Sequence, residues 1–149
     1  MNINKKDRKV AINLFRPRAN KAGTLEEGVS VVRNKFARFN FCRFHCKCQE
    51  DIESNRAYFG LAFINVRHIR ESIFGTINPD VVSTPLEYET YRLPQHADIY
   101  YGLVIPRGQP LPNDLNFAIE SIYKKSSYLE DKFPSNKRWK GIKEYKNLS

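Results

Sequence analysis

Hydrophobic residues alternate with polar ones in several short segments of the chain, and this period of two predicts β-strands. One such segment is 97–105, whose predicted inner face consists of Ala97, Ile99, Tyr101, Leu103 and Ile105. Residues 57–64 are apolar in both alternating sets, which is typical of a central strand that is covered on both faces. Strands are also predicted over 10–15, over the β-branched run 29–32 and, at a sheet edge before a proline, over 80–84.

Two other segments have the spacing of amphipathic helices. Asn65 is placed to cap a short helix that ends at Gly75, with apolar positions Val66, Ile69, Ile73 and Phe74. A longer helix is predicted over 114–129, with a buried stripe of Leu115, Ala118, Ile119, Ile122, Ser126 and Leu129. The expected fold is α+β: a mixed sheet of four or five strands packed by one long C-terminal helix and one short helix. We expect one domain over 10–130, a flexible N-terminus at 1–9 and a basic C-terminal tail at 131–149.

Charge is divided unevenly among the 149 residues, which carry a net charge of +9. Residues 1–48 hold 12 basic and 3 acidic side chains, residues 49–121 hold 5 and 10, and residues 122–149 hold 8 and 3. Basic ends therefore flank an acidic middle, which indicates either one directed face or two distinct partners. The chain contains neither a run of about 18 apolar residues nor an N-terminal secretory pattern, so we expect a cytoplasmic protein with no membrane partner.

One histidine is placed for chemistry at the start of the strand over 97–105. At a period of two, His96, Asp98 and Tyr100 project from one face, and Arg92 lies just upstream as a candidate phosphate contact. A histidine beside a carboxylate and a phenol can act as general acid or base, for example in metal-independent RNA cleavage. The alternative is a structural histidine at a strand end, hydrogen-bonded to Asp98.

Three cysteines and a histidine crowd one short segment: Cys42, His45, Cys46 and Cys48. These are zinc-ligand types, but structural zinc sites usually combine two ligand pairs that are distant in sequence, and no second cluster exists here. We therefore expect reduced, partly buried thiols, with no metal and no cofactor.

The C-terminal segment mixes cations with aromatic residues, a combination that suits single-stranded nucleic acid because cations neutralise phosphates and aromatic rings stack on bases. The candidate binding residues, extended by two N-terminal arginines, are Lys132, Lys137, Arg138, Trp139, Lys140, Lys143, Tyr145, Lys146, Arg16 and Arg18. The alternative is that Trp139 docks into the protein's own core and leaves the lysines in water.

Three segments of the chain resemble a group of small bacterial proteins with no assigned function. The segments are Glu26–Val31, Tyr58–Ala62 leading to Ile69-Arg70, and His96–Ile99. The resemblance implies a bacterial, cytoplasmic, single-domain protein and assigns no role to any residue.

We therefore expect a non-catalytic module that binds nucleic acid or a nucleoprotein partner through its basic ends. The alternatives are a metal-independent ribonuclease or phosphotransfer enzyme that uses His96, and an interaction subunit that docks an acidic protein. A homodimer in which the acidic middle of one copy meets the basic ends of another stays open.

Overall fold

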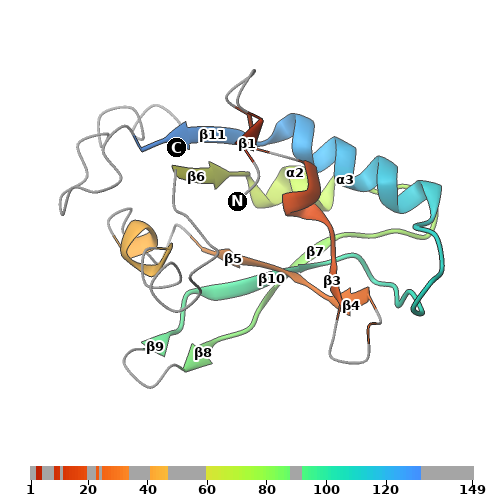
Figure 1. Cartoon of the computed structure of the whole chain (residues 1–149), viewed down its shortest axis with the longest axis horizontal. Coiled ribbons are helices and arrows are strands. Elements are labelled where there is room, and N and C mark those ends of the chain that lie inside the picture. The colour runs from red at the N-terminus through yellow and green to blue at the C-terminus, as the bar shows by residue number, and fades with distance from the viewer. Residues whose placement is uncertain are drawn as a thin grey trace. The chain divides into compact units, whose positions relative to one another are not determined.

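A computed structural model describes residues 3–4, 9–10, 12–19, 23, 25–33, 41–46, 60–87 and 92–131 (Figure 1). Helices and strands are both present, so the α+β class is confirmed. The backbone divides into two compact units, each built from segments that are discontinuous in sequence. The first unit comprises Met1–Ala11, Asn34–Phe63 and Ser127–Ser149, and the second comprises Ile12–Arg33 and Ile64–Ser126.

The second unit contains most of the described elements. They are the 3-10 turn η1 (Ile12–Phe15), β3 (Arg18–Ala19), β4 (Leu25–Glu27), β5 (Val29–Val32), α2 (Val66–Arg70), β7 (Asp80–Ser83), β8 (Leu86–Glu87), β9 (Arg92–Leu93), β10 (His96–Tyr100) and α3 (Asn113–Lys125). β5, β10 and β7 form an antiparallel sheet with β10 in the centre. β3 pairs with β4, and β8 pairs with β9.

The core of the second unit lies between one face of this sheet and α3. Ala97 and Ile99 of β10 and the predicted stripe of α3 have almost no exposed surface: Leu115, Ala118, Ile119 and Ile122. The alternation of β10 and the 3.6-residue period of α3 are both satisfied by this packing. The strand predictions over 29–32 and 80–84 are confirmed by β5 and by β7, which is an edge strand within the described sheet.

The predicted sheet of four or five mixed strands is corrected in two respects. Within the described residues the largest sheet has three strands, and every pairing is antiparallel. The segment 10–15 contains the turn η1 instead of a continuous strand, because Ile12 and Phe15 are three residues apart and one 3-10 turn directs both toward the core. The described part of the segment 57–64, β6 (Gly60–Phe63), pairs with β11 (Ser127–Glu130) in the first unit.

Both predicted helices form, but each is shorter than expected. Asn65 caps α2 as predicted, since its side chain accepts a hydrogen bond from Arg67 N at 2.9 Å. α2 ends at Arg70, which leaves Ile73 56% exposed instead of buried. α3 ends at Lys125 because the Ser126 hydroxyl bonds to the Tyr123 carbonyl and its backbone turns extended. The residues after Ser126, predicted to be helical up to 129, form β11.

One outward-facing backbone N–H of the edge strand β7 is bonded by a side chain of the same strand. Thr84 N donates to His96 O across the sheet. Because successive N–H groups of a strand point to opposite sides, Val81, three residues before Thr84, directs its N–H away from β10. Asp80 Oδ1 accepts this N–H at 2.7 Å and also the Arg70 Nε–H at 2.7 Å. The Arg70 hydrogen bond, followed by that from Val81, lowers the pKa of Asp80. The carboxylate thereby blocks a backbone donor that another strand would otherwise pair with.

Tyr101 connects η1 to the core through its hydroxyl, which donates to the carbonyl of Phe15. Burial raises the pKa of Tyr101 above its usual value. We expect Tyr101→Phe to lower the free energy of unfolding by about 1–2 kcal/mol, because a buried carbonyl loses its donor. Urea unfolding measures the change. Tyr123→Phe is the control, since the Tyr123 hydroxyl makes no such hydrogen bond within the described residues, and an equal loss in both variants would contradict the assignment.

The first unit contains β1 (Ile3–Asn4), β2 (Lys9–Val10), β6, β11 and the helical residues 41–46. β1 pairs with β2, and β2 lies beside β11. Leu61 forms the centre of a small apolar cluster with Cys42, Cys46, Phe63 and Leu129. Gly60 is required where β6 meets β11, because a Cβ there would overlap the Leu129 carbonyl.

Candidate functional site

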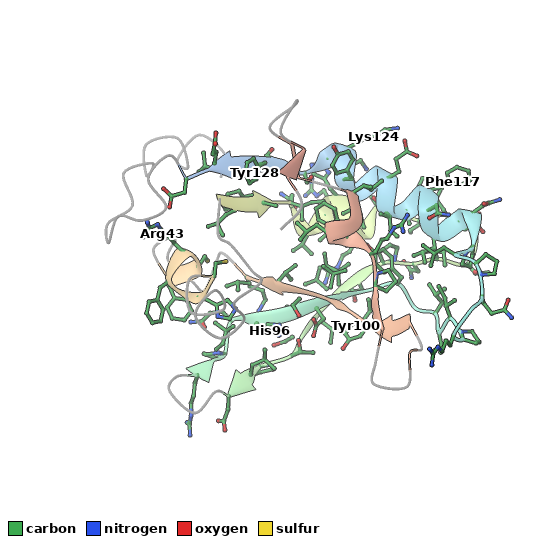
Figure 2. All side chains as sticks on the ribbon, viewed as in Figure 1. Arg43, His96, Tyr100, Phe117, Lys124 and Tyr128 are labelled. Carbon is green, nitrogen blue, oxygen red and sulfur yellow. The ribbon has the colours of Figure 1, made fainter. Side chains whose placement is uncertain are left out.

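His96, Asp98 and Tyr100 lie on one face of β10, opposite the core face, as the period of two predicts. Figure 2 labels His96 and Tyr100 on this strand. In the register of the sheet, His96 is opposite Val32, and Asp98 is flanked by Ser30 and Val82. Asp98 and Tyr100 are half-buried, whereas His96 is only 4% exposed. The predicted residues are therefore brought together on the outer face of the three-stranded sheet.

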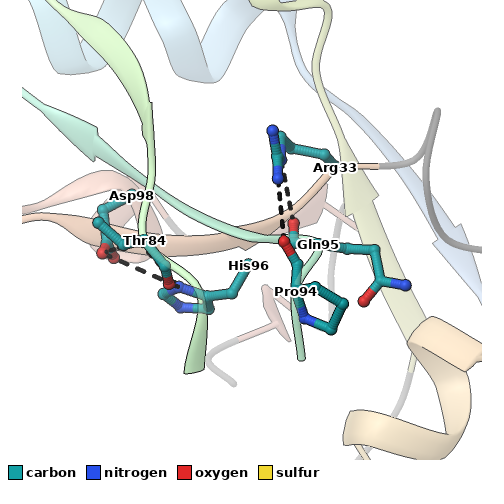
Figure 3. Close-up of polar contacts among 6 residues, drawn as sticks. All are labelled: Arg33, Thr84, Pro94, Gln95, His96 and Asp98. Carbon is teal, nitrogen blue, oxygen red and sulfur yellow. Dashed lines mark hydrogen bonds and ion pairs between the residues drawn. The ribbon is translucent and has the colours of Figure 1, made fainter. Parts of the chain in front are cut away.

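Thr84, which the sequence analysis did not single out, joins His96 to Asp98 (Figure 3). His96 Nδ1 lies 2.6 Å from the Thr84 carbonyl oxygen and 2.9 Å from Thr84 Oγ1. Thr84 Oγ1 donates to Asp98 Oδ2 at 2.6 Å. A carbonyl oxygen only accepts hydrogen bonds, so the proton of the neutral imidazole is assigned to Nδ1 and the lone pair to Nε2.

The accessible chemistry of this histidine is decided by the position of Nε2. That atom is buried and has no hydrogen-bond partner in the part of the chain that the structure describes. A general base must come within hydrogen-bond reach of the proton that it removes. In this conformation the imidazole instead holds the Thr84 backbone against β10. The structural alternative expected a hydrogen bond to Asp98, but His96 Nδ1 is 4.0 Å from Asp98 Oδ2 and Thr84 lies between them. The catalytic role stays a prediction.

Arg92 is not brought to this histidine by any described contact. It lies on β9, its side chain is 80% exposed, and its Nε is 3.2 Å from Glu87 Oε1 across the β8–β9 pair. The arginine that does lie beside this end of β10 is Arg33, which sequence reasoning missed. Its Nη2 donates to the Pro94 carbonyl at 2.9 Å, and its backbone N–H donates to Gln95 O (Figure 3).

Gly28 allows the close approach of β10 at Asp98. A Cβ on Gly28 would lie 2.6 Å from Asp98 Cβ and 3.1 Å from the Ile99 carbonyl oxygen. The segments Glu26–Val31 and His96–Ile99, which carry the sequence resemblance, thus meet in space, because β5 and β10 pair directly. A glycine ahead of a β-branched run was the available sequence signal for this close contact.

We expect His96→Ala to lower the free energy of unfolding by about 1–3 kcal/mol, because the Thr84 carbonyl loses its donor and the imidazole leaves a cavity. Urea unfolding measures this loss, with His68→Ala as the matched control on the exposed side of α2. His68 is 44% exposed, so its replacement should change stability by under about 0.5 kcal/mol.

The same His96 variant tests the ribonuclease alternative: full retention of any RNA cleavage seen in the wild type would exclude it.

Cys42 and Cys46 lie one helical turn apart in residues 41–46 and pack against Leu61. Burial raises the pKa of Cys42 to about 11, so its thiol is protonated at neutral pH. Metal binding requires the thiolate, and the raised pKa opposes it. Among the described residues no group of three His, Cys, Asp or Glu side chains is placed to hold a metal ion, and Cys48 lies outside them.

A buried ion pair, which the sequence analysis missed, joins two distant parts of the first unit. Arg43 Nε donates to Asp131 Oδ2 at 2.6 Å, and the two side chains are only 5% and 4% exposed. Arg43, labelled in Figure 2, lies in the helical residues 41–46, and Asp131 directly follows β11. The two residues are 88 positions apart, so no local pattern indicates their pairing.

Eight of the predicted nucleic-acid contacts lie outside the described residues, because they all follow Asp131: Lys132, Lys137, Arg138, Trp139, Lys140, Lys143, Tyr145 and Lys146. Arg16 is described and exposed, just after η1, and Arg18 belongs to β3. These two arginines fall in the second unit, whereas the C-terminal cations fall in the first.

The net charge is carried almost entirely by one unit. The segments of the first unit hold 15 basic and 7 acidic side chains, a net charge of +8. Those of the second unit hold 10 basic and 9 acidic side chains, a net charge of +1. Most of the net positive charge of the two basic ends thus falls in the first unit. The acidic side chains of residues 64–121 are balanced by basic side chains of the second unit.

No helix of the described residues has the length and apolar character needed to cross a membrane. Comparisons with protein-family models, with curated proteins and with solved structures found no match.

Proposed function

We propose that this chain is a small, non-catalytic binding module of the bacterial cytoplasm, and that its first unit binds single-stranded nucleic acid. The observation that carries the proposal is the partition of charge, +8 in the first unit against +1 in the second. A polyanion is attracted by a local concentration of cations, and phosphate neutralisation with counterion release supplies most of non-specific nucleic-acid affinity.

The aromatic residues of the same unit favour a single strand over a duplex. Phe133, Trp139 and Tyr145 alternate with lysines and arginine in the C-terminal segment. Aromatic rings stack on unpaired bases, and each such contact contributes about 1–3 kcal/mol whatever the base. An acidic protein surface offers carboxylates but no nucleobases. It would therefore interact with the lysines and the arginine and give the aromatic rings no base to stack on.

The experiment is a titration with single-stranded RNA, single-stranded DNA and duplex DNA at two salt concentrations. The full chain is compared with the variant K137Q/K140Q and with the matched control K124Q/K125Q, whose lysines lie on α3 in the second unit. A substitution that removes one phosphate interaction should flatten the plot of log K against log salt by about 0.7 for a single strand. We expect a flatter slope for K137Q/K140Q and an unchanged slope for the control.

Two results would overturn the proposal. One is the absence of salt-sensitive binding to any of the three nucleic acids. The other is an equal reduction of affinity in both variants, which would make the attraction a property of the total charge instead of the first unit. Recovery of a stoichiometric acidic protein from nuclease-treated lysate, with no nucleic-acid binding, would support the interaction-subunit alternative.

A further inference from the structure

The two edges of the three-stranded sheet in the second unit differ in how they are protected. At the β7 edge, Asp80 accepts the outward-facing N–H of Val81, and Pro85, which has no N–H, follows the strand. β5 forms the other edge, and among the described residues β10 is the one strand that pairs with it. Its residues Val29–Val32 include neither a proline nor a charged side chain. Within the described sheet, only the β7 edge thus carries features that oppose pairing with a further strand.

The ladder between β5 and β10 shows which backbone groups of β5 face outward. Arg33 N donates to Gln95 O at one end of this antiparallel ladder. Because successive residues of a strand direct their N–H and C=O groups to opposite sides, Arg33 and Val31 face β10, whereas Ser30 and Val32 face away from it. Among the described backbone hydrogen bonds, none is donated by Ser30 or Val32, and Ser30 is exposed. The β5 edge therefore presents N–H and C=O groups of two residues to which a further strand can bond.

The composition of this edge favours an identical strand as its partner. When two copies meet about a two-fold axis, the same residues face one another, so a charge in the contact would be repelled by its own counterpart. Val29–Val32 contains no charge, and the whole second unit carries a net charge of only +1. Val31 is half-buried and packs against the core at the margin of the sheet. A second β5 would place a valine beside this remaining apolar surface.

We propose that two copies of this chain associate through β5, with the two strands antiparallel about a two-fold axis at Ser30. Val31 of one copy then lies opposite Val29 of the other on the core face, and β-branched pairs in this position stabilise antiparallel sheets. An axis at Val31 would instead place Arg33 opposite Val29. This association is independent of the proposed nucleic-acid binding.

The pairing forms a continuous sheet of six strands, three from each copy. Its strand order is β7, β10, β5, β5, β10, β7. Both outer edges of this sheet are β7 strands, at which Asp80 already bonds an outward N–H. The association therefore closes at two copies instead of continuing into a fibre.

The first test uses the unmodified chain at concentrations from about 1 μM to about 1 mM, which cover the weak affinities expected of a small interface. In sedimentation equilibrium, the mass should rise from 17.4 kDa to twice that value. Amide hydrogen exchange, resolved by NMR, should slow by about tenfold or more at Ser30 and Val32 once the dimer predominates. Ser83 is the internal control, because its N–H faces outward on β7 and should exchange at one rate throughout.

The second test is a pair of matched substitutions at the two edges. Ser30→Pro removes an outward N–H of β5 and leaves the donors of the β5–β10 ladder in place. It should weaken association by about tenfold or more, because each copy loses one hydrogen bond of the contact. Ser83→Pro makes the same change at the outward position of β7, and its association should equal that of the wild type.

Several results would overturn the inference. A mass of one chain over the whole range does so, as does an exchange rate of Ser30 and Val32 that is independent of concentration. Both are measured on the unmodified chain and decide the matter even if Ser30→Pro fails to fold. Undiminished association of a folded Ser30→Pro, loss of association in a folded Ser83→Pro, or a mass that rises past two chains would equally contradict it.

Discussion

Asp131→Ala is expected to lower the free energy of unfolding of the first unit by about 3–5 kcal/mol. The substitution removes the Asp131 carboxylate, whose Oδ2 lies 2.6 Å from Nε of the buried Arg43 guanidinium. A buried charge that loses its partner keeps the full cost of its removal from water, which explains the size of the effect. Urea unfolding gives the change, and amide hydrogen exchange of β6 and β11 shows whether it lies in this unit.

Asp80→Ala is the matched control for this prediction. Asp80 also accepts a hydrogen bond from an arginine Nε, at 2.7 Å, but both side chains of that pair are more than half exposed. Solvent screens an exposed pair, so the change should stay below about 1 kcal/mol. Equal losses in the two variants would show that burial does not govern the strength of these pairs.

Ile122→Ala is expected to cost about 2–5 kcal/mol of stability in the second unit, the next largest effect. Ile122 has no exposed surface and lies in the core stripe of α3. Truncation removes buried methyl groups and leaves a cavity that the sheet and helix fill only in part. Thermal and urea unfolding both report the loss.

Ile73→Ala provides the comparison with the same residue type at an exposed position. Ile73 is 56% exposed after α2, so its truncation should change the unfolding free energy by under about 0.5 kcal/mol. The original helix prediction, which buried Ile73, requires a loss similar to that of Ile122. The difference between the two variants therefore tests the early end of α2 as well as the core.

Predictions from local patterns were confirmed where the residues that decide the structure lie within a single helix, strand or cap. The α3 stripe from Leu115 to Ile122 was predictable because a helix that packs on a sheet repeats its buried positions every three to four residues. The common face of His96, Asp98 and Tyr100 followed from the pleat of a single strand. The Asn65 cap was predictable because the side chain and the backbone N–H that it satisfies are two residues apart.

The errors occurred where several local structures fit the same residues. Residues 126–129 continue an acceptable helical stripe, but Ser126 ends α3 and Leu129 instead packs on Leu61 through β11. The run 10–15 is apolar enough for a strand, yet its side chains fill the core from a single turn at Ile12–Phe15. In both cases the partner that decides the structure is far away in the sequence, and tertiary packing overrides local preference.

By itself, the sequence determined the α+β class, the buried stripe of α3, the face shared by His96, Asp98 and Tyr100, and the charge available for binding. These properties depend on residue type and on spacing along one segment. Only the tertiary structure decided that Thr84 joins His96 to Asp98, that Arg43 meets Asp131 across 88 positions, and that most of the net charge falls in one unit. The physical reason is that the type of a polar side chain limits which groups it can bind, whereas the path of the whole chain determines which of those groups comes within reach.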